Sequence, residues 1–182
     1  MNLEEVILVN EADEEIGVME KLEVHQKALL HRAFSVFLFN NKGEMLLQRR
    51  AMNKYHSAGL WTNACCSHPR PGESVESAAL RRTREELGIN PQLEKAFVFT
   101  YRASFENGLT EHEYDHVFIG IHEGDINADP NEVSEVKYLP MSEIKNELAS
   151  NANKYTAWFQ IAFQKLQDHL MQADYEFGKS DH

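Results

Sequence analysis

The chain has 182 residues, of which 42% are hydrophobic and 26% are charged, and its formal net charge is −11. This composition predicts one globular domain that spans residues 1–182 and buries a core of its own. The negative charge argues against a nucleic-acid partner. We also expect neither a membrane span nor a secretion signal, because there is no long apolar run and no basic-then-apolar start.

The first half of the chain alternates strand and helix signals. A short strand is predicted at residues 6–9. Residues 34–39 and 45–49 then flank the segment Asn40–Gly43, whose glycine tolerates the positive φ of a tight turn, so we expect a β-hairpin. Residues 73–87 are rich in Arg and Glu, both strong helix formers, and a glycine follows that can cap the end. We expect a helix there.

The second half predicts more strands and then a final helix. Residues 97–101 and 111–119 alternate in character as strands do, and 133–139 reads as another strand. Ser142 is expected to cap a short helix. The last helix is predicted from an apolar stripe at Trp158, Phe159, Ala162, Phe163, Leu166 and Leu170. We expect residues 172–182 to be a frayed tail. The mixture predicts an α/β (α+β) sandwich with a mixed sheet flanked by helices.

The two cysteines of the chain, Cys65 and Cys66, are neighbours. An ordinary disulfide between neighbours is strained, so we expect free thiols and a reducing cytoplasm. Cys65 is expected to be a small buried hydrophobe.

Glu86 follows Arg82 by four residues, so the two side chains share one face of the predicted helix. A carboxylate beside a guanidinium can hold a metal ion and a phosphate together. The alternative is a surface ion pair that contributes about 0.2–0.5 kcal/mol.

Glu111 and Glu113 are two residues apart on a predicted strand and therefore point the same way. Two carboxylates on one partly buried face repel each other unless a cation lies between them. His25, His31 and His68 could complete the shell of that cation, and such a ligand set suits Mn²⁺ or Zn²⁺ better than Mg²⁺. The alternative is a solvated edge strand with ordinary surface histidines.

The stretch from Ser67 to Ile89 resembles the Nudix box, Gly-x5-Glu-x7-Arg-Glu-U-x-Glu-Glu-x-Gly-U, where U is aliphatic. The matching positions hold Glu73, Arg81, Glu85, Glu86, Gly88 and Ile89. The departures are Ser67 for the first glycine, Arg82 for the glutamate after the arginine, and Thr83 for an aliphatic residue. In Nudix hydrolases that missing glutamate helps to bind the catalytic metal, so Arg82 argues against ordinary hydrolysis.

A larger set of residues, from about Val6 to Phe163, resembles the type I isopentenyl-diphosphate isomerases. The matching elements are Lys21, His25-x5-His31, Arg49-Arg50-Ala51, Lys54, Trp61-Thr62-Asn63, Cys66-x-His68-Pro69, Gly72-Glu73-Ser74, Arg81-Arg82, Glu86-Leu87-Gly88, Tyr101-Arg102-Ala103, Glu111-x-Glu113 and Trp158. The Cys-x-His-Pro and Glu-x-Glu elements are specific together and weak alone. The resemblance implies a Nudix-type sandwich that interconverts isopentenyl and dimethylallyl diphosphate in isoprenoid biosynthesis.

The resemblance also implies catalytic roles. The reaction moves the double bond of an unactivated alkene, so a tertiary carbocation is the expected intermediate. Cys66 and Glu113 would be the proton-transfer pair on opposite faces, with Glu113 and Tyr101 on the acid side and Cys66 on the base side. Trp158 would offer its π face to the cation, although the alternative of helix packing is equally simple.

The same resemblance implies two metal sites and an anion site. Glu86, with the backbone of Cys66 nearby, would hold Mg²⁺ on the substrate's diphosphate, and the histidine and glutamate residues would hold Mn²⁺ or Zn²⁺. The remaining positive charge would come from Lys21, Arg50, Lys54 and Arg82. Taken singly, each of these four is as well explained as a solvated surface residue. The expected partner is a small diphosphate, with no membrane and no nucleic acid, and the sequence gives no oligomeric state.

Two other functions compete with the isomerase. A Nudix diphosphate hydrolase would release phosphate, and a non-catalytic sensor of the same fold would bind a phosphorylated metabolite without turning it over. Arg82 argues against the first, and the retention of every proton-transfer and ligand position argues against the second.

Overall fold

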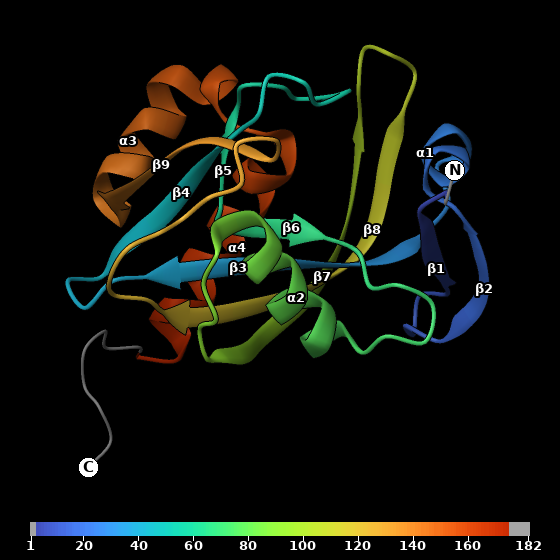
Figure 1. The fold of residues 1–182 in the computed structure, drawn as a ribbon, viewed down its shortest axis with the longest axis horizontal. Coiled ribbons are helices and arrows are strands. Elements are labelled where there is room, and N and C mark those ends of the chain that lie inside the picture. Colours follow the sequence, from blue (N-terminus) through green and yellow to red (C-terminus); the bar gives the residue numbers. More distant parts are fainter. Residues whose placement is uncertain (1–2, 175–182) are drawn as a thin grey trace.

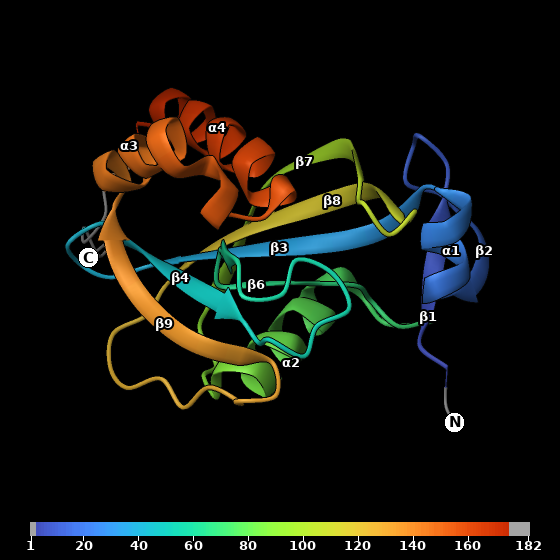
Figure 2. The same ribbon diagram turned by 90° about the horizontal axis from the view of Figure 1, so that it is seen from above.

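The computed structural model describes residues 3–174, which form a mixed sheet with helices on both faces (Figures 1 and 2). The strands are β1 (Glu5–Val9), β2 (Glu15–Glu20), β3 (His31–Phe39), β4 (Glu44–Arg50), β5 (Trp61–Thr62), β6 (Cys65–Ser67), β7 (Leu93–Ser104), β8 (Thr110–Ile121) and β9 (Val133–Pro140). The helices are α1 (Lys21–Lys27), α2 (Val75–Leu87), α3 (Met141–Asn151) and α4 (Ala157–Gln172), with a short 3₁₀ turn at Ala152–Lys154. The predicted fold class is confirmed.

The predicted hairpin is present, and its two strands separate immediately after the turn. Gly43 has φ 77°, and Phe39 pairs with Met45 beside it. Beyond that pair, β3 runs between β8, which is parallel to it, and β6, which is antiparallel. Strand β4 instead pairs with β9 and β5. The splayed hairpin therefore leads into two branches of the sheet.

Alternation along β3 builds a core on each face of the sheet. Phe37 and Phe39 pack with α3 and α4 on one face. Phe34 and Leu38 pack with α2 on the other. Successive strand residues point to opposite faces, so one apolar strand can serve both layers. Each fully buried phenylalanine contributes about 1.5–3 kcal/mol to stability. Figure 2 shows the same arrangement, with α2 and the α3–α4 pair on opposite sides of the sheet.

Helix α2 begins two residues later than the sequence predicted. The Ser74 hydroxyl caps it by accepting the N–H of Ser77 at 3.2 Å, a favoured N-cap interaction. Gly88 ends the helix in the left-handed region at φ 69°, as expected. Glu73 therefore lies outside the helix, where its carboxylate accepts two hydrogen bonds from Arg81 at 2.7 and 2.8 Å.

The expectation for Ser142 is wrong, because α3 starts earlier. Pro140 occupies the N-cap position with φ −58°, and Met141 is already helical, so there is no side-chain cap. Helix α4 carries the predicted apolar stripe and is capped by the hydroxyl of Thr156, which accepts the N–H of Phe159 at 3.3 Å. Most of the expected tail lies outside the described residues. Within residues 3–174, no helix is long and apolar enough to cross a membrane.

Candidate functional site

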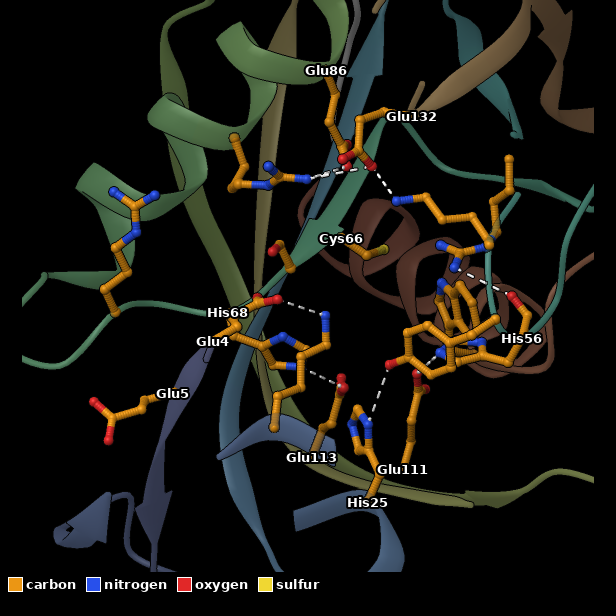
Figure 3. A pocket seen from close by; sticks show the side chains of 18 of the residues that line it. Glu4, Glu5, His25, His56, Cys66, His68, Glu86, Glu111, Glu113 and Glu132 are labelled. Atoms are coloured by element: carbon orange, nitrogen blue, oxygen red, sulfur yellow. Dashed lines mark hydrogen bonds and ion pairs between the residues drawn. The ribbon is translucent and has the colours of Figure 1, made fainter. Parts of the chain in front are cut away.

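One cavity of about 820 Å³ brings together the ends of α1, β4, β6, β8 and α4 with α2 and the loop after β4 (Figure 3). All the predicted site residues line it except His31, which contacts the lining residue His68. Its charged lining residues are Lys21, Arg50, Lys54, Arg70, Arg81 and Arg82 against Glu4, Glu5, Glu86, Glu111, Glu113 and Glu132. In a chain of net charge −11, this cavity is formally neutral. It can therefore accept an anion, most favourably together with a cation.

The register of the central strands explains why His31 and Glu113 meet. They are direct partners in the parallel ladder between β3 and β8, and both point to the face that also carries Phe37. His31 Nε2 lies 3.5 Å from Glu113 Oε1. His68 follows β6, whose last residue Ser67 pairs with β3, so its side chain returns to the same face. His68 Nε2 lies 3.0 Å from Glu113 Oε1 and 3.3 Å from His31 Nε2.

Helix α1 adds the fourth member of this group. His25, His31, His68 and Glu113 offer ligand atoms that all lie within 4.8 Å of one another. Nε2 of His25 is buried and has no hydrogen-bond partner among residues 3–174, while His68 faces the group through its Nε2. Burial and the neighbouring imidazoles lower the pKa of His25 to about 3, and burial lowers the pKa of His68. Neutral imidazoles with unused lone pairs are the form that binds a metal, so these residues fit a divalent ion.

Glu111 lies outside that group of four and shares a hydroxyl with Glu113. The Tyr101 hydroxyl lies 2.9 Å from Glu111 Oε2 and 2.7 Å from Glu113 Oε2. Burial and the charge of Glu113 raise the pKa of Glu111. Burial also acts to raise the pKa of Glu113, but hydrogen bonds from His31 and His68 outweigh it and hold that pKa well below its usual range. These opposite shifts favour a protonated Glu111 and an ionised Glu113, with the Tyr101 hydroxyl between them.

His56 is a site residue that the sequence reasoning missed. Its Nε2 lies 3.5 Å from Glu111 Oε1, and its ring stacks on Phe105 and meets Trp158 edge-on at 5.8 Å between ring centroids. Burial and nearby Arg50 lower the pKa of His56 to about 4, so its ring is neutral at pH 7. His56 is a lone histidine in the loop after β4 and belongs to no motif, so the sequence contains no pattern that predicts its place in the site.

The Cys66 thiol lies among hydrogen-bond acceptors. It donates to Asn63 Oδ1 at 3.0 Å and lies 3.5 Å from the hydroxyl of Ser35, which itself donates to Asp115 Oδ2 at 2.6 Å. The Asn63 amide nitrogen is engaged by the carbonyls of Val36 and Cys65, which fixes its oxygen toward the thiol. Burial, together with the charge of Asp115, raises the pKa of Cys66. Its surroundings therefore favour the protonated thiol.

The four predicted anion-binding residues come from separate elements, and each has a partner. Lys21 Nζ lies 3.1 Å from Glu4, Lys54 is ion-paired with Glu132, and the Arg50 guanidinium lies 5.1 Å from the ring centroid of Trp158. Arg82 donates to Glu86 Oε1 at 2.9 Å.

Glu86 is 7% exposed, so its pair with Arg82 is not a surface ion pair. Its second oxygen accepts from Gln48 Nε2 at 3.2 Å. A charged carboxylate that is held from two sides and borders a cavity fits a ligand for a hard divalent cation.

Comparisons with known proteins agree with this geometry. Residues 29–159 match the NUDIX domain. The chain is 47% identical over 169 residues to the isopentenyl-diphosphate Delta-isomerase of Pectobacterium atrosepticum, covering 93% of this chain and 94% of that protein. It is 48% identical to isopentenyl-diphosphate Delta-isomerase 2 of Photorhabdus laumondii, covering 90% and 95%. Among solved structures, DR0079 from Deinococcus radiodurans superposes with a TM-score of 0.75 at 20% identity, covering 89% of this chain and 98% of that one.

Proposed function

The chain belongs to the isopentenyl-diphosphate Delta-isomerase family of NUDIX-domain proteins, and from that membership we propose that its cavity interconverts isopentenyl and dimethylallyl diphosphate. One observation carries the proposal at the level of residues. Cys66 and the Tyr101–Glu113 pair line the same cavity, together with Trp158 and a set of cations. Isomerisation of an alkene that adds a proton on one face and removes another from the opposite face uses two such proton-transfer groups.

The proposed reaction moves one proton in and another out. In the direction toward dimethylallyl diphosphate, the Glu113–Tyr101 side gives a proton to the terminal methylene, and the double-bond electrons form the new C–H bond. The tertiary cation that results lies beside Trp158, whose face stabilises it. The Cys66 sulfur then removes a proton from C2, the carbon between the cationic carbon and the carbon that carries the diphosphate. The electrons of the broken C–H bond form the new double bond.

The reverse direction uses the same groups with their roles exchanged. A Cys66 thiol then donates its proton and an ionised Glu113 accepts one. This second arrangement is supported for the resting cavity, since burial raises the pKa of the Cys66 thiol and hydrogen bonds from His31 and His68 lower the pKa of Glu113. Transfer of one proton from the Cys66 thiol to the Glu113 carboxylate converts this arrangement into the one used in the forward direction. Tyr101 and Glu111, which are hydrogen-bonded to each other beside Glu113, could carry that proton during the transfer.

We further propose which metals the protein uses. The NUDIX domain and the His25–His31–His68–Glu113 group support binding of a divalent metal. For that group, with Glu111 joining it, we propose Mn²⁺ or Zn²⁺, because imidazoles predominate. For Glu86 we propose Mg²⁺ bound together with the diphosphate. A divalent ion at either place would supply positive charge, which would make Glu113 a stronger acid at the first and offset the phosphate charge at the second.

We also propose that residues 1–182 act as a single domain in the cytoplasm. Free thiols at Cys65 and Cys66 fit a reducing compartment.

A product assay separates this proposal from its rivals. The protein is incubated with isopentenyl diphosphate and Mg²⁺, and dimethylallyl diphosphate and phosphate are measured in parallel. Dimethylallyl diphosphate without phosphate is expected. Phosphate without isomerised product would instead establish a hydrolase, and substrate binding with neither product would establish a sensor.

A further inference from the structure

Glu132 borders the cavity just before β9 and joins two of the cations assigned above to the diphosphate. Its Oε2 atom is ion-paired with Lys54 Nζ and lies 3.6 Å from Arg82 Nη2 (Figure 3). Lys54 comes from the loop after β4, and Arg82 comes from α2. A single carboxylate oxygen therefore faces two cations that the fold brings in from separate segments.

The backbone around Glu132 is fixed to both of those segments. The Glu132 carbonyl accepts the N–H of Ala51 at 3.0 Å, at the start of the loop that carries Lys54. The Glu132 N–H donates to the Asp129 carbonyl at 3.0 Å, and the Asp129 N–H donates to the carbonyl of Glu86, in α2, at 2.9 Å. The position of the Glu132 carboxylate is thus set relative to the loop and to the helix at once.

Two neighbouring cations repel each other, and the ammonium group of a lysine is mobile because it is carried on a flexible four-carbon side chain. A shared carboxylate offsets the repulsion and limits the positions that the lysine can take. The pairing uses one N–H of Lys54 and leaves the other two for phosphate oxygens. The contact therefore preorganises an anion site before its ligand binds. Preorganisation reduces the loss of side-chain conformational entropy on binding.

We propose that Glu132 is a positioning residue of the diphosphate subsite, holding Lys54 and Arg82 together as one pair of cations at the edge of the cavity. The inference rests on the proposed function for the identity of the anion. It assigns Glu132 no contact with the reacting carbons. Binding of the diphosphate should depend on Glu132, while the proton transfers should not.

The substitution Glu132→Gln separates positioning from simple electrostatics. Removing a negative charge from an anion site should by itself strengthen anion binding. Loss of positioning should weaken it. The matched control is Glu135→Gln, which removes the same charge from β9 at a side chain that is 57% exposed, pairs with Arg49 at 3.6 Å and does not line the cavity.

Calorimetric titration with inorganic diphosphate and Mg²⁺ tests the inference without any catalysis. We expect Glu132→Gln to raise the dissociation constant about tenfold, which corresponds to about 1.4 kcal/mol, and Glu135→Gln to leave it within about twofold. With Lys54→Gln already present, adding Glu132→Gln should weaken binding by much less than tenfold, because the two residues act as a pair. Unchanged or tighter binding in Glu132→Gln, or equal weakening in both glutamate variants, would overturn the inference.

Steady-state kinetics supply the second readout. Glu132→Gln should raise the KM for isopentenyl diphosphate about tenfold and leave kcat within about twofold, as expected for loss of binding alone. A fall in kcat at unchanged KM would contradict a positioning role. If the parent protein failed to isomerise the substrate, the proposed function would fall, and the titration with inorganic diphosphate would still decide the role of Glu132.

Discussion

His31 and Glu113 are direct partners across the parallel ladder of β3 and β8, and their side chains meet on one face at 3.5 Å between Nε2 and Oε1. The same face carries Phe37 and Phe39 further along β3. The alternation along β3 thus builds an apolar core under α3 and α4 at one end and, at the other, contributes His31 to the group that we propose holds a divalent ion. The site is a continuation of the core face.

The first prediction separates the two proton-transfer groups. Glu113→Gln and Cys66→Ala should each lower kcat about 10²–10⁴-fold, the usual contribution of a positioned acid or base. Glu113→Gln should also lower the content of metal at the histidine group, because Glu113 Oε1 lies beside His31 and His68. Cys66→Ala should keep that metal. Metal analysis of the purified variants checks this, and equal metal loss in both would refute the separation of roles.

The second prediction concerns the face of Trp158. Its side chain is buried, the Arg50 guanidinium lies over it at 5.1 Å, and His56 meets it edge-on. If the indole stabilises a cation by about 2 kcal/mol, Trp158→Leu should lower kcat about thirtyfold, and Trp158→Phe should recover part of the loss. Single-turnover kinetics check this. Equal rates in the leucine and phenylalanine variants would reduce Trp158 to packing.

The third prediction concerns the glycine that ends α2. Gly88 has φ 69°, and a Cβ there would lie 2.6 Å from the backbone oxygen of Asn127. Gly72 has a similar φ of 77°, but a Cβ there would have no atom of residues 3–174 within 4 Å. Gly72→Ala should therefore cost about 1 kcal/mol of unfolding free energy from backbone strain alone, and Gly88→Ala clearly more. Urea unfolding of both variants measures the difference, and equal costs would remove the steric explanation.

The fourth prediction concerns acid stability of the metal-free protein. Burial lowers the pKa of His56 from 6.5 to about 4 in the folded state. Between these values the unfolded chain binds the proton and the folded chain does not, so stability is present above pH 6.5 and is lost as the pH falls toward 4. The loss of unfolding free energy from this group is at most about 3–4 kcal/mol. His25, with a pKa of about 3, acts in the same direction.

His56→Phe keeps a ring against Phe105 and removes the titration. Urea unfolding at pH 6.5, 5.5 and 4.5 should show a shallower loss of stability for this variant than for the parent. Parallel curves for the two proteins would show that His56 contributes nothing to the pH dependence.

The sequence predicted local features of this protein well where a short pattern determines them. Glu111 and Glu113 share a face because strand side chains alternate, and Gly88 ends a helix because it tolerates a positive φ. The bounds of α2 and α3 were less accurate. Ser74, not Glu73, marks the start of α2 as its N-cap residue. Pro140 occupies the N-cap position of α3, two residues ahead of Ser142.

Convergence of distant residues was beyond any local pattern. His25 reaches the other histidines only because β1, β2 and α1 pack against the end of β3. No periodicity in the sequence specifies that packing. The family resemblance was what predicted that the histidines share one site. His56 and Glu132 are isolated polar residues in loops, and their importance depends on neighbours that the fold brings in.

The most direct test of the account is proton NMR of isopentenyl diphosphate incubated with the protein and Mg²⁺ in D₂O. We expect dimethylallyl diphosphate with deuterium in the methyl group that was the terminal methylene, and no such signal with Cys66→Ala or Glu113→Gln. Dimethylallyl diphosphate that forms without deuterium from solvent in the early turnovers and survives loss of either residue would contradict the proton-transfer roles. Absence of any isomerised product from the metal-loaded parent would contradict the isomerase itself.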